Sequence, residues 1–181
     1  MEPMTREQAW QHLVGNNIVK RAIEVSLVRQ HRLHIYGKAD NTYLISELEL
    51  DHVSISSPCA CGNYADIHGI CQCEPGQVVR DFPGDMAAWV TTPSIRDYHR
   101  GAQESFSTMM QRVAVAQKQA LPIDLTQASN VLLGTAIEKL DVGMRRVYAA
   151  IEVARSIAQL DQQLHIEAHH IAEAIQYQRL H

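Results

Sequence analysis

The residues best suited to chemistry are four cysteines, Cys59, Cys61, Cys71 and Cys73, which all lie in one fifteen-residue stretch. They form two Cys-x-Cys pairs, and the nine residues between the pairs include Gly and Asn, which favour a tight return of the chain. Four closely spaced thiolates match the ligand set of a tetrahedral zinc ion. Because four protein ligands leave no coordination position open, we predict a structural zinc site and not a catalytic one.

Other interpretations of these cysteines stay open at this point. The four thiols could bind no metal, or the pairs could form redox-active disulfides, although a reducing compartment disfavours disulfides. His68, which lies between the two pairs, could replace one thiolate as a ligand. The first residues lack the basic-then-apolar layout of a secretory signal, and no apolar run approaches the ~20 residues of a membrane span. We therefore expect a cytoplasmic protein.

Composition and charge narrow the classes of function. The chain has 181 residues, of which 46% are hydrophobic, so it can build a core without covalent cross-links. Lys and Arg number 16 against 20 Asp and Glu, and the net charge of −4 argues against broad electrostatic attraction to nucleic acid. Conventional hydrolase motifs are missing from the sequence, and His169 and His170 are adjacent, not spaced i, i+4. We predict that both histidines are exposed or at a boundary on the last helix.

Local patterns predict the elements that must position the cysteines. Thr5 and Gln8 can cap a short helix near the amino terminus. Asn16 or Asn17 begins a longer helix that continues to about Gln30 and has apolar residues at helical spacing. Short strands are predicted at three apolar runs, residues 33–36, 53–55 and 86–90. The second of these strands leads into the cysteine stretch.

From about Ser94 onward the pattern is helical, with Pro122 after the first helix and Thr126 capping the second. The expected fold class is α+β and mostly α: residues 1–93 form a fragmentary α/β part with the zinc loop at residues 58–76, and residues 94–181 form a helical bundle. Apolar stripes on the four helices are predicted to face the core: Phe106, Met109, Met110 and Val113; Leu132, Leu133, Ala136, Ile137 and Leu140; Met144, Val147, Ile151, Ala154 and Ala158; Ile171, Ala174 and Ile175.

Three segments together resemble magnesium-chelatase-like AAA+ ATPases of the ComM type. Residues 13–25 are similar to a turn and helix before the family's phosphate loop, residues 57–77 to its Asn-Pro-Cys-Pro-Cys-Gly … Cys-x-Cys-x-Pro-x-Gln element, and residues 143–179 to its helical lid. The resemblance covers most of the chain in the family's order. It implies an AAA+-like α/β part followed by a lid-like domain. It also implies that Val14 and Gly15 border an adenine and that Arg145 corresponds to the lid arginine that reaches the γ-phosphate.

The comparison with this family also identifies what the chain lacks. The family has a phosphate loop, Gly-x4-Gly-Lys-Ser/Thr, where residues 37–42 read Gly-Lys-Ala-Asp-Asn-Thr, without a second glycine and with Lys38 directly after the first. Residues 48–51 imitate the family's acidic magnesium-binding strand but follow Gly37 too closely for a crossover between parallel strands. Ser57 replaces an asparagine that senses the γ-phosphate, and residues 88–91 contain no arginine for a neighbour's nucleotide.

We therefore expect a catalytically inactive, zinc-stapled relative of these ATPases that acts as a protein-interaction module, with itself or with an intact ATPase. Residual ATP or ADP binding would involve Val14, Gly15 and Arg145. One alternative is a nucleic-acid-binding accessory module, because the family acts on DNA and Tyr64 and Trp89 could stack on bases. Another is a weak ATP-binding protein whose site is completed by another chain. No membrane partner is expected.

Overall fold

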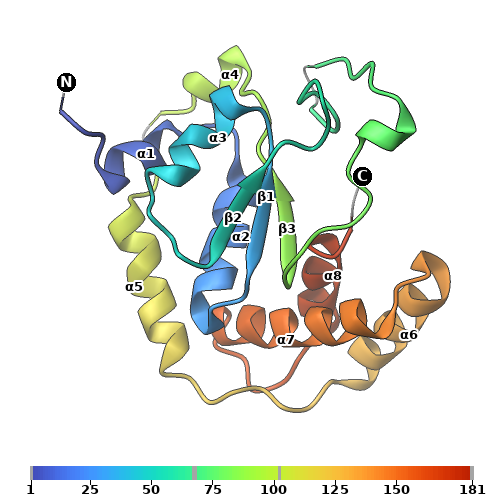
Figure 1. Ribbon diagram of the computed structural model, residues 1–181. Coiled ribbons are helices and arrows are strands. Elements are labelled where there is room, and N and C mark those ends of the chain that lie inside the picture. The colour runs from blue at the N-terminus through green and yellow to red at the C-terminus, as the bar shows by residue number, and fades with distance from the viewer. Residues whose placement is uncertain (1, 67–68, 102, 180–181) are drawn as a thin grey trace.

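The computed structural model describes residues 2–66, 69–101 and 103–179 and shows a mixed α/β chain (Figure 1). Short helices and strands alternate in its first half, and helices alone make up its second half. The elements are α1 (Arg6–His12), α2 (Asn17–Arg29), β1 (Leu33–Tyr36), α3 (Ala39–Ser46), β2 (Val53–Ser56), the 3-10 turn η1 (Pro75–Gln77), β3 (Met86–Trp89), α4 (Ile95–Tyr98), α5 (Phe106–Gln117), α6 (Gln127–Leu140), α7 (Met144–Leu160) and α8 (Ala168–Gln176).

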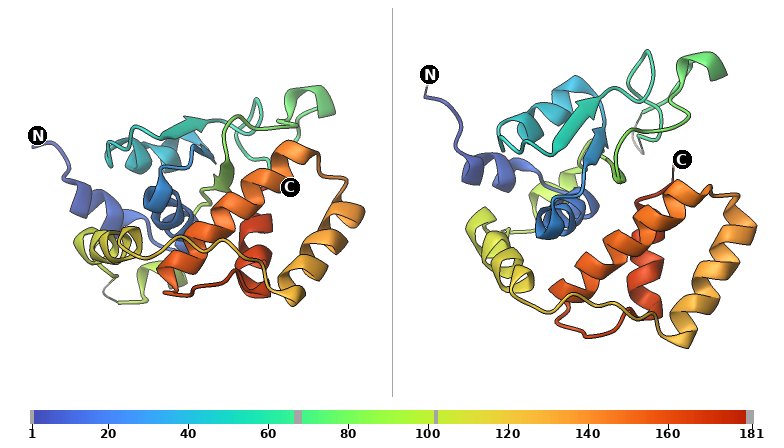
Figure 2. Two further views of the ribbon diagram at one scale, coloured as in Figure 1. Left: turned by 90° about the horizontal axis from the view of Figure 1, so that it is seen from below. Right: turned by 60° about the horizontal axis from the view of Figure 1, so that its bottom comes forward.

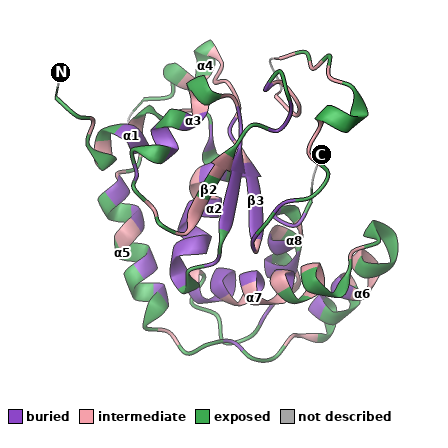
Figure 3. Cartoon of the chain, viewed as in Figure 1, coloured by how far each residue is buried: buried purple, intermediate pink, exposed green. Residues whose placement is uncertain are grey.

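The three strands form one parallel sheet in the order β2-β1-β3. In its register, Leu33 lies opposite Val53 and Met86. All four residues of the central strand β1 are buried, as expected for a parallel strand with a neighbour on each side (Figure 3). The three predicted strands are confirmed.

Helix α3 makes the crossover between the parallel strands β1 and β2, and it was not predicted. Residues 37–42, which were compared with a phosphate loop, directly follow β1 and form the first turn of α3, with Lys38 as the N-cap. Residues 48–51 are not a strand; they belong to the turn that leads into β2. The crossover from β1 to β2 therefore consists of α3 and this turn.

Helix α2 covers one face of the sheet and packs against α5 and α7 (Figure 2). Its predicted bounds are confirmed, with Asn16 as N-cap and Gln30 in the left-handed conformation at the C-cap. The main core lies between these helices and the sheet and contains the fully buried Ile23, Ile35 and Ile157. On the other face, a smaller apolar cluster covers β1 and β3; it comprises Tyr36, Phe82 and Ala87, with Val79 and Trp89 packed against it.

The helices α6, α7 and α8 pack together at one end of the molecule, where both α6 and α7 contact α8 (Figure 2). The capping box at Thr5 and the cap at Thr126 are confirmed. The core prediction was wrong for part of the α6 and α7 stripes: Ile137 and Leu140 are 39% and 37% exposed, and Met144 is 73% exposed. These residues lie where α6 ends and α7 begins (Figure 3). None of the helices in the described ranges has the length and apolar character required to cross a bilayer.

Candidate metal centre and adjoining pocket

The four cysteines come together in the loop between β2 and β3, with their sulfur atoms all within 4.8 Å of one another. The Sγ atoms of Cys59 and Cys61 are 3.5 Å apart, and each lies 3.8 Å from Sγ of Cys71. Four thiolates around zinc, with bonds of about 2.3 Å, would have sulfur atoms about 3.8 Å apart in a tetrahedron. The donor set and its spacing can therefore hold a metal ion.

Backbone contacts fix the cysteine loop in this conformation. The Pro58 carbonyl accepts the Val79 amide at 2.9 Å, and Cys59 forms an antiparallel bridge with Val78. Backbone amides in the described part of the loop donate to the sulfur atoms, among them Cys61 N to Cys73 Sγ at 3.3 Å, Asn63 N to Cys61 Sγ at 3.4 Å, and Tyr64 N to Cys59 Sγ at 3.4 Å. Such amide donors stabilise the thiolate form, which is the form that binds metals.

The cysteine thiols affect one another's protonation. The Asn63 amide is the main group that lowers the pKa of Cys61, to about 6, and hydrogen bonds with Cys73 and Cys59 add to it. The Cys61 amide also lowers the pKa of Cys73, but desolvation and hydrogen bonds with the other three thiols outweigh it and raise that pKa to about 11. Once one thiol of this cluster is ionised, the next thiol loses its proton less readily, and a bound cation would compensate this repulsion.

The cysteine loop is tied to the start of α3. Lys38 Nζ lies 3.6 Å from Oδ2 of Asp66, a carboxylate in the loop whose side chain is only 4% exposed. The Thr92 hydroxyl donates to the same carboxylate at 3.0 Å, and Asn41 donates to Thr92 at 3.0 Å. Gly62, at φ +79°, allows the loop to approach Lys38, because a Cβ there would lie 3.1 Å from Lys38 Cγ. These contacts join the loop to the turn after β1.

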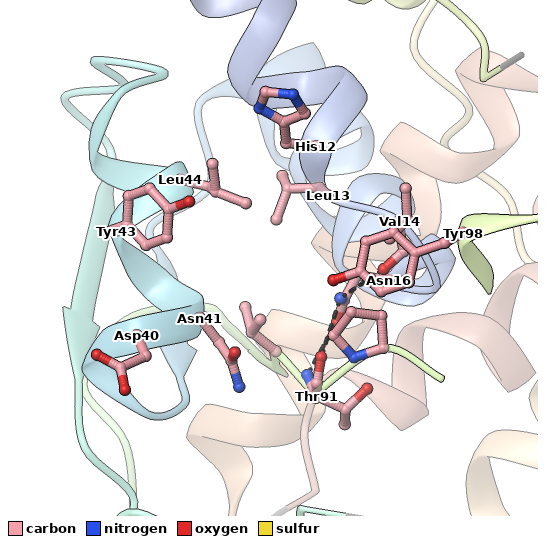
Figure 4. A pocket seen from close by; sticks show the side chains of 12 residues that line it. His12, Leu13, Val14, Asn16, Asp40, Asn41, Tyr43, Leu44, Thr91 and Tyr98 are labelled. Carbon is pink, nitrogen blue, oxygen red and sulfur yellow. Dashed lines mark hydrogen bonds between the residues drawn. The ribbon is translucent and has the colours of Figure 1, made fainter. Parts of the chain in front are cut away.

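A pocket of about 360 Å³ adjoins this turn (Figure 4). The buried Asn16 shapes one wall, because its amide group accepts the Thr91 N–H at 2.9 Å and donates to the Thr91 carbonyl at 3.1 Å. Asp40 contributes a carboxylate, and the lining residues include neither Lys nor Arg, so the pocket lacks the permanently charged side chains that usually bind a phosphate. The lining residues are His12, Leu13, Val14, Asn16, Asp40, Asn41, Tyr43, Leu44, Val90, Thr91, Pro93 and Tyr98.

Of the three residues compared with nucleotide contacts, Arg145 lies apart from the other two. Val14 lines this pocket, and Gly15 lines a neighbouring cavity of about 890 Å³ at the start of α2, which shares Asn16 and Thr91 with the pocket. Arg145 is exposed and donates to the Gly84 carbonyl at 3.3 Å, near the amino end of β3, while the pocket lies at the carboxyl end of that strand. The structure thus does not bring Arg145 to Val14.

Other predicted residues have structural contacts. The Ser57 hydroxyl donates to the Cys59 carbonyl at 2.6 Å and so shapes the cysteine loop. His68 lies outside the described residues. The Lys38–Asp66 ion pair was missed, because an ordinary Lys and an ordinary Asp far apart in the sequence carry no spacing signal. Arg146, also missed, donates to the Phe82 carbonyl at 2.6 Å and stacks 3.6 Å from the Phe82 ring, which connects α7 to the segment before β3.

The prediction for the two adjacent histidines was wrong for His170, which is completely buried. Its Nδ1 accepts the Glu167 amide at 2.9 Å at the start of α8, so in the neutral ring the proton is on Nε2, which faces Asp161 at 3.2 Å. His169 Nε2 lies 3.4 Å from the same carboxylate. Although these three residues lie close enough to hold a metal, the protonated Nε2 of His170 cannot ligate one.

One comparison with known proteins identifies the chain's family. The model of the family described as magnesium chelatase, subunit ChlI C-terminal, matches residues 85–178, just over half of the chain and the region from β3 to α8. The chain belongs to this magnesium chelatase family. No curated protein matches the chain. The cysteine loop lies before the matched residues, so its chemistry rests on its own geometry.

Proposed function

We propose that this chain is a shortened, degenerate relative of the ComM-type magnesium-chelatase-like ATPases. In this proposal it does not hydrolyse ATP and serves as a protein-interaction module whose cysteine loop holds structural zinc. Residues 1–93 would form the reduced AAA+-like part and residues 94–181 the lid-like part. The family match supports the relationship for residues 85–178, and the contacts of the turn after β1 support the loss of activity.

The main observation that supports the loss of activity is that the residues compared with a phosphate loop form other contacts. The backbone amides of Asn41 and Thr42 both donate to the Lys38 carbonyl at 2.9 Å, so they are not free to donate to a phosphate. Thr42 is 5% exposed, and its hydroxyl, in the place of the one that holds Mg²⁺ in the family, donates to the same carbonyl at 3.2 Å. Lys38 is paired with Asp66. These two amides, the Thr42 hydroxyl and the Lys38 ammonium group therefore each have another partner.

The proposed zinc ligands are Cys59, Cys61, Cys71 and Cys73. Four soft sulfur donors at tetrahedral spacing, with amide donors to the sulfurs, favour zinc over oxygen-preferring ions such as Mg²⁺ or Ca²⁺. A bound zinc ion would supply a cross-link within the segment that connects β2 to β3 and no chemistry of its own. The cysteine side chains hold the loop beside Lys38, which keeps the Lys38–Asp66 pair in place.

Exposed apolar side chains support a role in protein interaction. Met144 and Tyr148 lie one helical turn apart at the start of α7 and are 73% and 62% exposed. Ile137 and Leu140, near the end of α6, are more than a third exposed. Exposed apolar side chains of this size are found where a protein contacts another protein.

Three measurements on the full chain test the proposal. ATP titrated with Mg²⁺ to millimolar concentration should give no binding heat, and no phosphate should be released. Metal analysis should find one zinc per chain, and chemical cross-linking should capture a protein partner or a second copy. Hydrolysis that is lost in Arg145→Ala but not in Lys38→Ala would contradict inactivity and favour a site completed by another chain. Recovery of only a monomer without partners would contradict the interaction role.

A further inference from the structure

The two outer edges of the sheet differ. At the β3 edge, the Ala87 amide donates to the Tyr177 carbonyl at 2.8 Å, and the Asp85 carbonyl accepts the Gln178 side chain at 2.6 Å. Residues after α8 therefore close this edge. At the β2 edge, within the ranges that the structure describes, no strand lies beyond β2 (Figure 1). An open edge of this kind can pair with a strand of another chain.

The ladder with β1 determines which backbone groups of β2 point outward. The amides of Leu33 and Gly37 donate to the carbonyls of His52 and Ser56, at 3.0 and 3.3 Å. In a parallel ladder, every second residue of a strand turns its backbone N–H and C=O groups toward the same neighbouring strand. His52, Ser54 and Ser56 therefore face β1, whereas Val53, Ile55 and Ser57 turn their backbone groups away from it.

Only a few outward backbone groups of β2 lack a partner. The Val53 amide already donates to the Leu50 carbonyl within a turn, at 3.1 Å. This leaves the Val53 carbonyl and both backbone groups of Ile55 and of Ser57. Among the described residues, none of these five groups has a protein partner.

We propose that β2 pairs antiparallel with β2 of a second copy of this chain, about a two-fold axis at Ile55. Each Ile55 amide then donates to the Ile55 carbonyl of the other copy, and each Ser57 amide donates to the Val53 carbonyl of the other copy. This single arrangement satisfies eight of the ten outward groups of the two strands and leaves only the two Ser57 carbonyls, because the Val53 amides are already bonded within the chain. The two sheets join into one six-stranded sheet. This inference rests on the proposed interaction role and assigns it a surface and a partner.

The side chains of β2 suit this pairing. Ser54 and Ser56 are exposed and small, so they allow a second strand to approach, and the two copies of Ile55 form a β-branched pair across the axis. The strand has no proline, lysine or other charged residue, which are the usual protections of an edge.

Charge favours the antiparallel direction. Glu49 and Asp51 lie just before β2 and are exposed. In the antiparallel pair this acidic end lies opposite Ser57 of the other strand and not opposite the acidic end of the other copy. A parallel pair would place the acidic ends of the two copies side by side, and like charges at that distance repel.

Concentration series on the full, zinc-loaded chain test this proposal. Sedimentation should show an equilibrium between the 20.3 kDa chain and a species of twice that mass. Residue-resolved hydrogen exchange should show that the Ile55 and Ser57 amides gain protection as the dimer forms. The Ala87 amide, bonded within the chain, should be protected at every concentration.

A matched pair of variants tests the surface itself. Ser54→Lys should weaken the dimer severalfold, because it places two cations beside the axis, whereas Ser107→Lys on the exposed surface of α5 should not. A monomer at every concentration, or a dimer in which Ile55 and Ser57 still exchange freely, would overturn the proposal. A complex with a different protein that protects these two amides would also overturn it, but would leave the interaction role standing. ATP hydrolysis would contradict the proposed function alone.

Discussion

The region from β3 to α8 and the turn after β1 stand in contrast. The first matches the magnesium chelatase family over residues 85–178, and its helices pack against α2 and against one another. The second has the residue types of a phosphate-binding turn, but Lys38 is paired with Asp66, and Thr42 is buried with its hydroxyl bonded to a backbone carbonyl. Packing and phosphate chemistry depend on different residues. A fold can therefore be kept while a reaction is lost.

The contrast also concerns what holds each region in place. The region from β3 to α8 is held by buried apolar side chains such as Ile157 and Ile171. The cysteine loop has few buried apolar residues, and sulfur contacts and the Lys38–Asp66 pair fix it. Changes to sulfur or charge should therefore affect the loop, and changes in apolar volume should affect the helical part.

The largest effect is expected at the cysteines. Cys59→Ser replaces the buried ligand, and we expect zinc affinity to fall by well over the roughly 10–100-fold that changes to a ligand's hydrogen-bond partners typically produce. Metal analysis and competition with a chelator measure the loss. Ala60→Ser, which adds the same hydroxyl at an exposed neighbouring position, is the control and should keep the metal. Equal zinc affinity in all three proteins would exclude the cysteine site.

The next effect tests the apolar packing of the helical part. Ile157→Ala in α7 leaves a cavity at a side chain that is 1% exposed, and it should lower the free energy of unfolding by about 2–5 kcal/mol. Met144→Ala on the same helix removes an exposed side chain and should change stability by no more than about 0.5 kcal/mol. Urea unfolding of both variants gives the comparison. Similar losses in the two would contradict the assigned core.

The pH dependence of the stability tests the contact between His31, just before β1, and Ser156 on α7. His31 Nε2 lies 2.7 Å from Ser156 Oγ, and burial, more than the neighbouring Arg29, lowers the pKa of His31 to about 4. Between about pH 6.5 and 4 the unfolded chain binds a proton that the folded chain does not, so stability is complete above this window and falls as the pH falls through it. The full loss is roughly 3 kcal/mol at most.

Unfolding at about pH 7 and about pH 5 measures this effect. His31→Gln should flatten the pH dependence over that window, and His99→Gln, at an exposed position, should leave it unchanged. Burial lowers the pKa of His34, His52 and His170 in the same direction, so part of the slope should persist in His31→Gln. An unchanged slope in that variant would show that His31 does not titrate as proposed.

The smallest effect concerns the Lys38–Asp66 ion pair in the turn after β1. Lys38→Met leaves the Asp66 carboxylate without this cation, and we expect a loss of about 1–2 kcal/mol, because Lys38 is one-third exposed and Asp66 keeps the Thr92 hydroxyl. Lys139→Met, at an exposed position on α6, is the control. Adding Asp66→Asn to Lys38→Met should restore part of the loss. If the double variant is less stable than Lys38→Met, the pair is not the cause.

Much of the fold could be predicted because its signals are local. The Thr5 capping box, the cap at Thr126 and the three strands follow from residue types a few positions apart. The gathering of the cysteines could also be predicted, because their number and spacing suit one metal ion. Periodicity indicated which residues share a helix face but not which neighbouring helix covers it. For this reason Met144 was expected in the core and is exposed.

The contacts on which the proposed function rests are not local. Lys38 and Asp66 come together only because the cysteine loop folds back onto α3, and neither residue type is unusual in a loop. Helix α3 was missed because residues 37–42 were compared with a phosphate loop and not considered as a helix start. His170 was expected near the surface; instead it is buried where it accepts the amide at the start of α8. Each of these outcomes depends on the packing of distant segments.

Native mass spectrometry of the untagged full chain, sprayed in the presence of Mg²⁺ and ATP, tests the central claim most directly. It reports bound metal, bound nucleotide and assembly mass in one spectrum. The expected result is one zinc ion per chain, no nucleotide and a population at twice the chain's mass. A metal-free folded chain, or a chain that carries stoichiometric ATP, would contradict the account.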